Sequence, residues 1–209
     1  METLFATRFD TGFGSLRIVS SEKGLAYVEL PNQSGRGFAG WMKTHARDAK
    51  VVECRAAYNT QDTHNTDNTH NVHDVPDEMV DELLEFTRGE RREFTMELDL
   101  RATEFQTAVY KVVAEIGYGE TLSYSDIAKA IGNPKAVRAV GAANGANPIP
   151  LVIPCHRVIA RGGALQGYAG GLTLKARLLA MESADSSRRR PHPMSSAFSG
   201  AAPIQERLF

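Results

Sequence analysis

Apolar and polar residues alternate in three short runs at the start of the chain. The runs are LFATRF (4–9), GSLRIV (14–19) and LAYVEL (25–30), and glycines and Pro31-Asn32 separate or follow them. In a strand, successive side chains point to opposite faces, so a period of two residues is typical of β-structure. The alternation therefore predicts a small antiparallel sheet.

Further elements are predicted up to residue 100. Residues 37–46 favour a helix with its large apolar side chains on one side, and VVECRAAY (51–58) favours another strand. A helix should begin at Pro76, with an acidic first turn that suits the helix dipole, and end at Gly89. The alternating run REFTMELDL (92–100) predicts one more strand.

The second half of the chain has the periodicity of helices. Apolar residues recur at helical spacing in 105–116. Ser123 can cap a following helix, with Asp126 three positions beyond it. Pro134 suits the first turn of the next helix, KAVRAVGAANG (135–145). Two short helices joined by a tight turn predict a helix-turn-helix, although many helical domains contain such a pair.

These elements predict an α/β fold in the broad sense, more narrowly α+β. We expect a sheet-containing domain at 1–100, a mainly helical domain at 101–183 and a flexible tail at 184–209. A polar loop is expected at 59–74, because that segment has almost no apolar residues. A metal site in this loop is the alternative, but the spacing fits no tight cage around its histidines, His64, His70 and His73.

Charge is distributed unevenly. The formal net charge is −1, yet residues 127–181 contain seven Lys or Arg and no Asp or Glu. Such a basic block suits a polyanion such as DNA, and a chance cluster on a solvated face is the alternative.

Composition also bears on location. No apolar run approaches the roughly 20 residues of a membrane span, and the N-terminus lacks the basic-then-apolar order of a signal peptide. The two cysteines cannot form a disulfide framework. We therefore expect no membrane association and a cytoplasmic location, associated with the nucleoid if the source is bacterial.

The two cysteines differ in their surroundings. Cys54 has the setting of an inert core thiol, whereas Cys155 precedes His156, a suitable general base for a thiol. Pro154 turns the backbone, and Arg157 adds positive charge that should lower the pKa of the Cys155 thiol. These residues favour a nucleophilic Cys155, and a Cys/His pair of structural origin remains the alternative.

Several longer segments resemble one known family. NPIPLVIPCHRVI (147–159), YAGG (168–171) and LLAME (178–182) resemble the active-site region of the O6-alkylguanine-DNA alkyltransferases, or methylated-DNA–protein-cysteine methyltransferases. NPKAVRAVGAANG (133–145) is similar to that family's recognition helix. The likeness is strong from residue 105 to 182 and loose over 1–100.

The resemblance implies a fold and an activity. It implies a ribonuclease H-like N-terminal domain and a C-terminal domain with the helix-turn-helix and the reactive cysteine. The implied activity is DNA repair by direct reversal. After base flipping, the alkyl group of O6-alkylguanine, and of O4-alkylthymine, passes irreversibly to Cys155, once per protein.

The resemblance also implies catalytic roles. Cys155 would accept the alkyl group, and His156 would relay its proton through water to Glu182. Asn147 would brace the turn that holds Cys155. For Glu182, a solvated carboxylate near a helix end is the alternative.

The implied base pocket has six contributing residues. Tyr124 would press on the 3′ phosphate and reach N3 of guanine, and Tyr168 would line the pocket. Backbone groups of Cys155 and Val158 would take the exocyclic amine, and the N–H of Ala169, where the family often has Ser, would meet O6. Pro150 would offer an apolar wall for bulky alkyl groups.

The implied DNA interface lies on the second helix of the pair. Arg138 would enter the base stack as an arginine finger. The helix would approach the minor groove closely because its neighbouring residues are small, namely Ala136, Ala139 and Gly141. Lys135 would lie beside them at the DNA. Because Cys54 is the one cysteine of the first domain, we expect no structural zinc, and the resemblance implies no cofactor.

The last residues lie outside the family pattern. Gln205-Glu206-Arg207-Leu208-Phe209 resembles the short motif by which bacterial repair proteins grip the DNA sliding clamp. An apolar segment that folds back on its own domain is the alternative. No heptad pattern appears, and we expect a monomer.

Two other functions compete with alkyl transfer. A non-catalytic binder of alkylated DNA would lack the acceptor cysteine, and Cys155 argues against it. A Cys–His–Glu hydrolase would need an oxyanion hole and turnover, and it would leave the acid-free helix-turn-helix unexplained.

Overall fold

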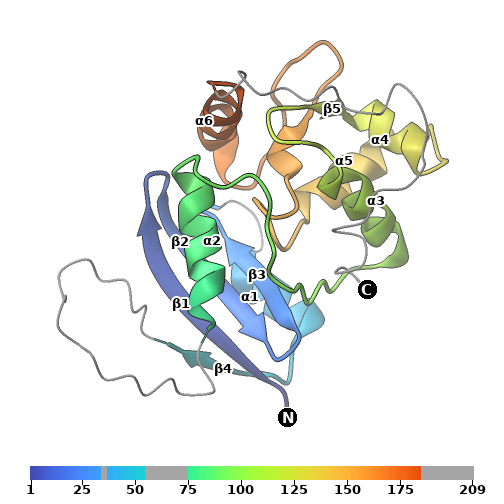
Figure 1. Cartoon of the computed structure of the whole chain (residues 1–209). Helices are drawn as coiled ribbons and strands as arrows, with labels where there is room; N and C mark the ends of the chain where they lie inside the picture. The colour runs from blue at the N-terminus through green and yellow to red at the C-terminus, as the bar shows by residue number, and fades with distance from the viewer. Residues whose placement is uncertain (34–36, 55–74, 185–209) are drawn as a thin grey trace. The chain divides into compact units, whose positions relative to one another are not determined.

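The computed structural model describes residues 1–33, 37–54 and 75–184. The chain divides into two compact units, Met1–Arg101 and Ala102–Phe209, and each is considered by itself (Figure 1). The predicted polar loop at 59–74, with its three histidines, and the tail from residue 185 lie outside the described residues.

The first unit contains a four-stranded sheet of order β3-β2-β1-β4. Its strands are β1 (Thr3–Thr11), β2 (Gly14–Ser21), β3 (Gly24–Glu29) and β4 (Lys50–Glu53). The first three pair antiparallel, as predicted, but β4 pairs parallel to β1. The predicted antiparallel sheet is therefore mixed, because helix α1 (Gly37–His45) connects β3 to β4 and lets the chain return in the direction of β1.

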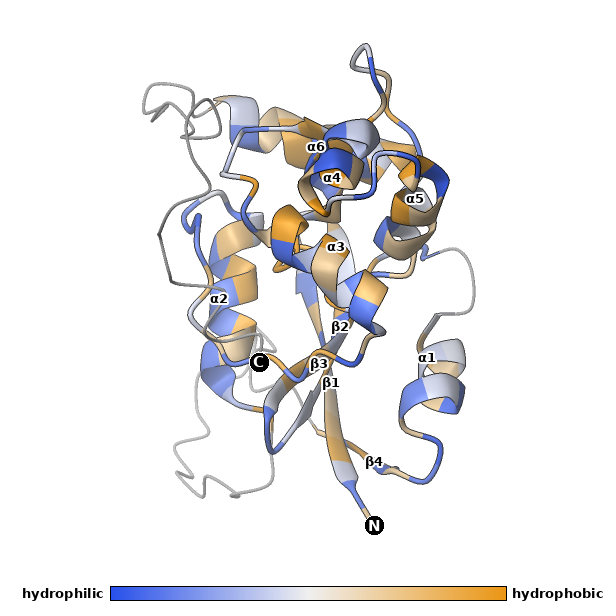
Figure 2. Cartoon of the chain, turned by 90° about the vertical axis from the view of Figure 1, so that its right-hand side faces the viewer, coloured by the Kyte–Doolittle hydropathy of each residue, from blue (hydrophilic) through white to orange (hydrophobic). Residues whose placement is uncertain are grey.

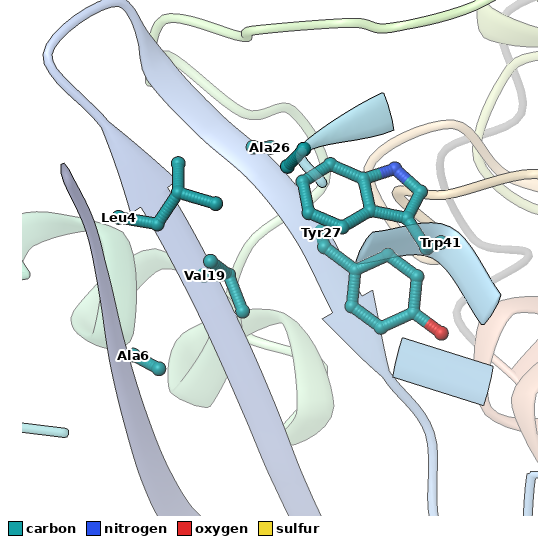
Figure 3. Close-up of a cluster of buried hydrophobic side chains, with 7 residues drawn as sticks. Leu4, Ala6, Val19, Ala26, Tyr27 and Trp41 are labelled. Atoms are coloured by element: carbon teal, nitrogen blue, oxygen red, sulfur yellow. The ribbon is translucent and has the colours of Figure 1, made fainter. Parts of the chain in front are cut away.

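Helices cover both faces of this sheet. Helix α1 lies on one face and α2 (Asp77–Thr87) on the other (Figure 2). Trp41 of α1 packs against Tyr27 with ring centroids 5.2 Å apart, in a cluster that also buries Leu4 and Val19 (Figure 3). Because a helix packs on each face, the strands of this sheet bury apolar side chains on both faces, although their sequences partly alternate.

The predicted strand at 92–100 is wrong. The described segment forms only an isolated bridge between Leu98 and Leu25, flanked by hydrogen bonds of 2.9 Å. Further along, the Thr95 N–H donates to the Glu82 carboxylate of α2, at 2.7 Å. A side chain of the neighbouring helix thus takes a donor that a strand would offer to the sheet.

The second unit is mainly helical. Its elements are α3 (Glu104–Ala114), β5 (Leu122–Ser123), α4 (Tyr124–Ala130), α5 (Val137–Gly145), the 3-10 turn η1 (Cys155–Arg157), β6 (Val158–Ile159) and α6 (Gly171–Ala184). Strands β5 and β6 pair in parallel. As predicted, Ser123 caps α4, and its side chain and that of Asp126 form a reciprocal capping box.

The second helix of the pair begins later than predicted. Helix α5 starts at Val137, and Pro134 lies in a separate turn closed by Ala136 N–H donating to Asn133 O at 2.9 Å. The preceding glycine, Gly132, has a φ of 73° and ends α4, so the chain must turn again before α5 can start. Lys135 and Ala136 therefore precede the helix instead of forming its first turn.

Among the described helices, none has the length and apolar character needed to cross a bilayer.

Candidate active site

Cys155 begins the 3-10 turn η1 and is 4% exposed. The turn before it is held by Asn147, whose amide donates to Ile153 O at 2.8 Å and whose carbonyl accepts from Ile149 N–H at 3.0 Å. Within this turn Leu151 has a φ of 77°, a conformation that L-residues other than Asn and Asp rarely adopt. A fixed and locally strained backbone thus places the sulfur.

Burial dominates the pKa of the Cys155 thiol. Desolvation raises this pKa to about 11, and a hydrogen bond from Asn147 and the charge of Lys175 oppose that rise in part. We expected Arg157 to lower the thiol pKa, but its guanidinium is directed at Glu182 instead. The thiol is therefore protonated at neutral pH and needs a base before it can attack.

His156 follows Cys155 in η1 and contacts Glu182. Its Nε2 lies 2.8 Å from Oε1 of Glu182, and both side chains are fully buried. Because an ionised carboxylate only accepts hydrogen bonds, the proton of the ring sits on Nε2, and Nδ1 carries the lone pair. Desolvation lowers the pKa of His156, with Arg157 and Lys175 adding to that effect, so the imidazole is neutral at rest.

Glu182 is fixed by more than His156. Arg157 donates from Nε at 2.9 Å and from Nη2 at 2.9 Å, and the Gly119 N–H donates at 3.0 Å. Desolvation would raise the pKa of Glu182, but hydrogen bonds from His156 and Arg157 and the positive charge of Arg157 outweigh it, and this pKa falls to about 2. Arg157 is held in turn by Ile116 O, at 2.6 Å from Nη1. The carboxylate is thus a permanent negative charge behind the imidazole.

Comparisons with known proteins bear on this site. The family model of the 6-O-methylguanine DNA methyltransferase, DNA binding domain, matches residues 104–184. A methylated-DNA–protein-cysteine methyltransferase of Mycobacterium tuberculosis is 54% identical over 103 residues, which cover 49% of this chain and 62% of that protein. The inducible protein of this name from Bacillus subtilis is 50% identical over 106 residues, covering 51% and 59%. The aligned segment thus spans about three fifths of these curated relatives.

A solved structure matches over a longer range. The crystal structure of Mycobacterium tuberculosis OGT in complex with DNA has a TM-score of 0.67 and 34% identity, and the match covers 86% of this chain and 93% of that one. The chain belongs to the O6-methylguanine DNA methyltransferase family. The predicted family and its α+β fold class are confirmed.

The residues that the family resemblance assigns to the base pocket lie close to Cys155 in the chain or in space. Tyr168 is 8% exposed, and its ring lies edge-on to that of His156 with centroids 6.3 Å apart. Tyr124 begins α4 and donates its hydroxyl to Gln166 O at 3.1 Å. Pro150 is buried and Ala169 is half-buried.

The two carbonyls expected to take the exocyclic amine already accept one hydrogen bond each. Cys155 O accepts from the Asn144 amide at 3.3 Å, and Val158 O accepts from Lys175 Nζ at 2.6 Å. A carbonyl oxygen has two lone pairs, so a second donor can still bind.

The residues assigned to DNA form a separate group on α5 and the turn before it. Arg138, Ala139 and Lys135 are exposed, and Ala136 and Gly141 are half-buried. Tyr124 approaches this helix: a Cβ added to Gly141 would lie 3.9 Å from its ring. These residues do not contact the His156–Glu182 pair in any described interaction.

Two cations are buried that the sequence placed on a surface, and one amide contact with Cys155 O was not predicted. Arg157 and Lys175 belong to the basic block that we expected to face a polyanion, yet they are 5% and 0% exposed. The signal was available for Lys175, because positions 175, 178 and 182 fall on one face of a helix and Glu182 was already assigned to the site. No sequence signal distinguished Asn144 from other polar residues of α5.

Proposed function

We propose that this chain is a single-turnover DNA-repair protein that transfers the alkyl group of O6-alkylguanine in duplex DNA to the sulfur of Cys155. The observation that carries the proposal is the buried series Cys155, His156, Glu182 within the family's PCHRV motif. A neutral imidazole beside a thiol, backed by a carboxylate that stays ionised, is suited to generate a thiolate.

The reaction balances in one displacement. The thiol proton passes, through water, to Nδ1 of His156, and Glu182 stabilises the imidazolium through Nε2. The sulfur then forms a bond to the alkyl carbon while the bond from that carbon to O6 breaks. Guanine leaves with the electron pair, its N3 accepting a hydrogen bond from the Tyr124 hydroxyl that the family resemblance implies, and the proton held by His156 returns through water to neutralise the displaced base. The product is a thioether, which water does not cleave, so the protein acts once.

The target atom must first leave the base stack, which costs a few kcal/mol. We propose that α4 and α5 form the helix-turn-helix that approaches the minor groove, with Arg138 inserted into the stack. Asn147 would keep the turn before Cys155 in place, and Tyr168, Ala169 and Pro150 would line the pocket. The exposure of Arg138 and Ala139 supports this placement.

A mass measurement tests the proposal. The protein is incubated with a duplex containing O6-methylguanine and then weighed intact and after digestion. We expect a gain of one methyl group on Cys155, in a one-to-one amount, and the same with O4-methylthymine at its own rate. Cys155→Ala should gain nothing, and Cys54→Ala, the matched control, should behave as the wild type.

The other outcomes identify the competing functions. Tight binding of the lesion duplex without any mass gain would indicate a non-catalytic binder. Release of several product molecules per protein would indicate a hydrolase. Either result would overturn the proposal.

Three finer expectations rest on the sequence. We propose that Gln205-Glu206-Arg207-Leu208-Phe209, outside the described residues, binds a bacterial sliding clamp through its apolar pair and Gln205. Deletion of residues 205–209 should abolish binding to a purified clamp, and equal binding with and without them would refute this. We also propose a monomer in the cytoplasm, which sedimentation and cell fractionation test.

A further inference from the structure

Lys175 is a buried cation for which the proposed reaction has no role so far. It lies on α6 and is 0% exposed. Its Nζ donates to Val158 O at 2.6 Å and to Gln166 O at 2.7 Å. No carboxylate pairs with it among the described ion pairs, so backbone oxygens are its recorded partners. An ammonium buried in this way costs free energy that an apolar side chain of similar length would not.

Its two partners belong to different segments of the proposed site. Val158 begins β6, three residues after Cys155, and its carbonyl is one of the two expected to take the exocyclic amine of the base. Gln166 lies in a glycine-rich loop, residues 162–170, two residues before Tyr168. Gln166 O also accepts the hydroxyl of Tyr124 at the start of α4. One ammonium therefore ties α6 to β6 and to the loop, and the loop carbonyl continues the connection to α4.

The positive charge of Lys175 also lowers the pKa of the Cys155 thiol. The titratable groups coupled to Cys155 are Lys175 of α6, Tyr110 of α3, Tyr124 of α4 and Tyr168 of the loop. Burial raises the pKa of each of the three phenols, so they are neutral at pH 7. His156, the chain neighbour of Cys155, is neutral as well, because burial lowers its pKa.

The remaining charges in the site neutralise each other. Arg157 and Glu182 form a buried ion pair, so neither offers its full charge to the sulfur. Burial lowers the pKa of Lys175 to about 8, which leaves it mostly protonated at neutral pH. Among the described groups named above, Lys175 is therefore the resting positive charge without a carboxylate partner, and the His156 imidazolium adds to it once the thiol proton has moved.

We propose that Lys175 is a positioning residue for the alkyl transfer, which holds the Val158 and Gln166 carbonyls at the two walls of the base pocket and supplies the positive field in which the Cys155 thiolate forms. The inference rests on the proposed function and deepens it. Lys175 stays an ammonium throughout, and the proton of the thiol goes to His156 as before.

The test separates this role from a merely structural one. The variants are Lys175→Met, which removes charge and donors, Lys175→Arg, which keeps the charge, and Arg177→Met as a matched control on the exposed side of the same helix. For each, the rate of Cys155 alkylation by iodoacetamide is measured at pH 7, where Lys175 is mostly protonated, with Cys54→Ala as background. Methyl transfer from an O6-methylguanine duplex is followed in single turnover at saturating DNA.

We expect Lys175→Met to slow iodoacetamide alkylation of Cys155 at pH 7, where Lys175 is mostly an ammonium, by about tenfold or more and to slow methyl transfer by a similar factor, since one pKa unit is a tenfold change in thiolate. DNA affinity should be unchanged. Lys175→Arg should recover at least a third of the lost alkylation rate, and Arg177→Met should match the wild type in both measurements.

An unchanged alkylation rate at pH 7 in folded Lys175→Met, or an equal loss in Arg177→Met, would overturn the proposal. If Lys175→Met does not fold, as judged by its circular dichroism and melting curve, Lys175→Gln takes its place, because it keeps donors without the charge. The iodoacetamide reaction needs no lesion. If the wild type transfers no methyl group, the proposed function fails while the alkylation rate at pH 7 still tests Lys175.

Discussion

Glu182→Gln changes the charge of the buried cluster and keeps its shape. The surroundings lower the pKa of Glu182 from 4.5 to about 2, and each pKa unit corresponds to about 1.4 kcal/mol. The ionised carboxylate therefore contributes about 3 kcal/mol to the free energy of unfolding at pH 7. Glutamine cannot supply this contribution, and it leaves Arg157 buried without a negative partner. We expect the variant to be less stable by about 3 kcal/mol.

The contribution of Glu182 to the free energy of unfolding should fall as the pH is lowered. The folded-state pKa of Glu182 lies below its unfolded-state value, so its contribution is complete above about pH 5.5 and is lost as the pH falls through 4.5 toward 2. Urea unfolding followed by circular dichroism at pH 7 and pH 3 measures this. The stability gap between wild type and Glu182→Gln should shrink to less than half at pH 3.

Glu115→Gln is the matched control, because Glu115 is exposed and belongs to the same unit. Its effect should stay within about 0.5 kcal/mol at both pH values. A gap for Glu182→Gln that is equally large at pH 3 and pH 7 would mean that the charge is not the source of the stability. An absent gap at pH 7 would mean that the cluster does not stabilise the fold.

Three further substitutions test the packing around the site and in the first unit. Ser123→Ala removes the capping box of α4 and should cost about 1 kcal/mol in urea unfolding. Tyr110→Phe removes a buried hydroxyl that donates to Ala143 O at 2.9 Å, between α3 and α5, and should cost about 1 kcal/mol by the same measurement, with no loss expected if that bond is absent. Gly24→Ala places a Cβ 2.3 Å from Glu97 O at a φ of +132° and should cost more than about 2 kcal/mol, read from the fluorescence of Trp41, the single tryptophan; an unchanged midpoint would refute the close approach.

Local signals predicted the helices well. The cap at Ser123 and the glycine after α2 depend on residues within a few positions of each other, and the structure has both. The strand at 92–100 failed because a strand needs a partner along its length, and alternation cannot reveal that Glu82 of α2 takes the Thr95 N–H. The parallel pairing of β4 with β1 was not predicted for a related reason, since it depends on where α1 returns the chain.

The motif located the proposed reactive pair but not its surroundings. PCHR places Cys155 and His156 next to each other, whereas the contact of His156 with Glu182 spans 26 positions of the chain and exists only after α6 has packed on η1. Long cationic side chains are usually solvated, so counting Arg157 and Lys175 toward a surface patch was reasonable from composition. Their burial follows from tertiary packing, which gives each of them fixed acceptors.

That burial bears on how tightly undamaged DNA is held. Five cations of the acid-free segment remain exposed: Lys129, Lys135, Arg138, Arg161 and Arg177. Each cation that meets a phosphate displaces counterions, with a slope of about −0.9 in log affinity against log salt. Between 50 and 200 mM salt these five can change affinity by at most about 500-fold, whereas seven would give about 6,000-fold. If the protein binds DNA as proposed, burial withholds the charges of Arg157 and Lys175 from nonspecific phosphate contacts, and the protein would dissociate more readily from DNA that carries no lesion.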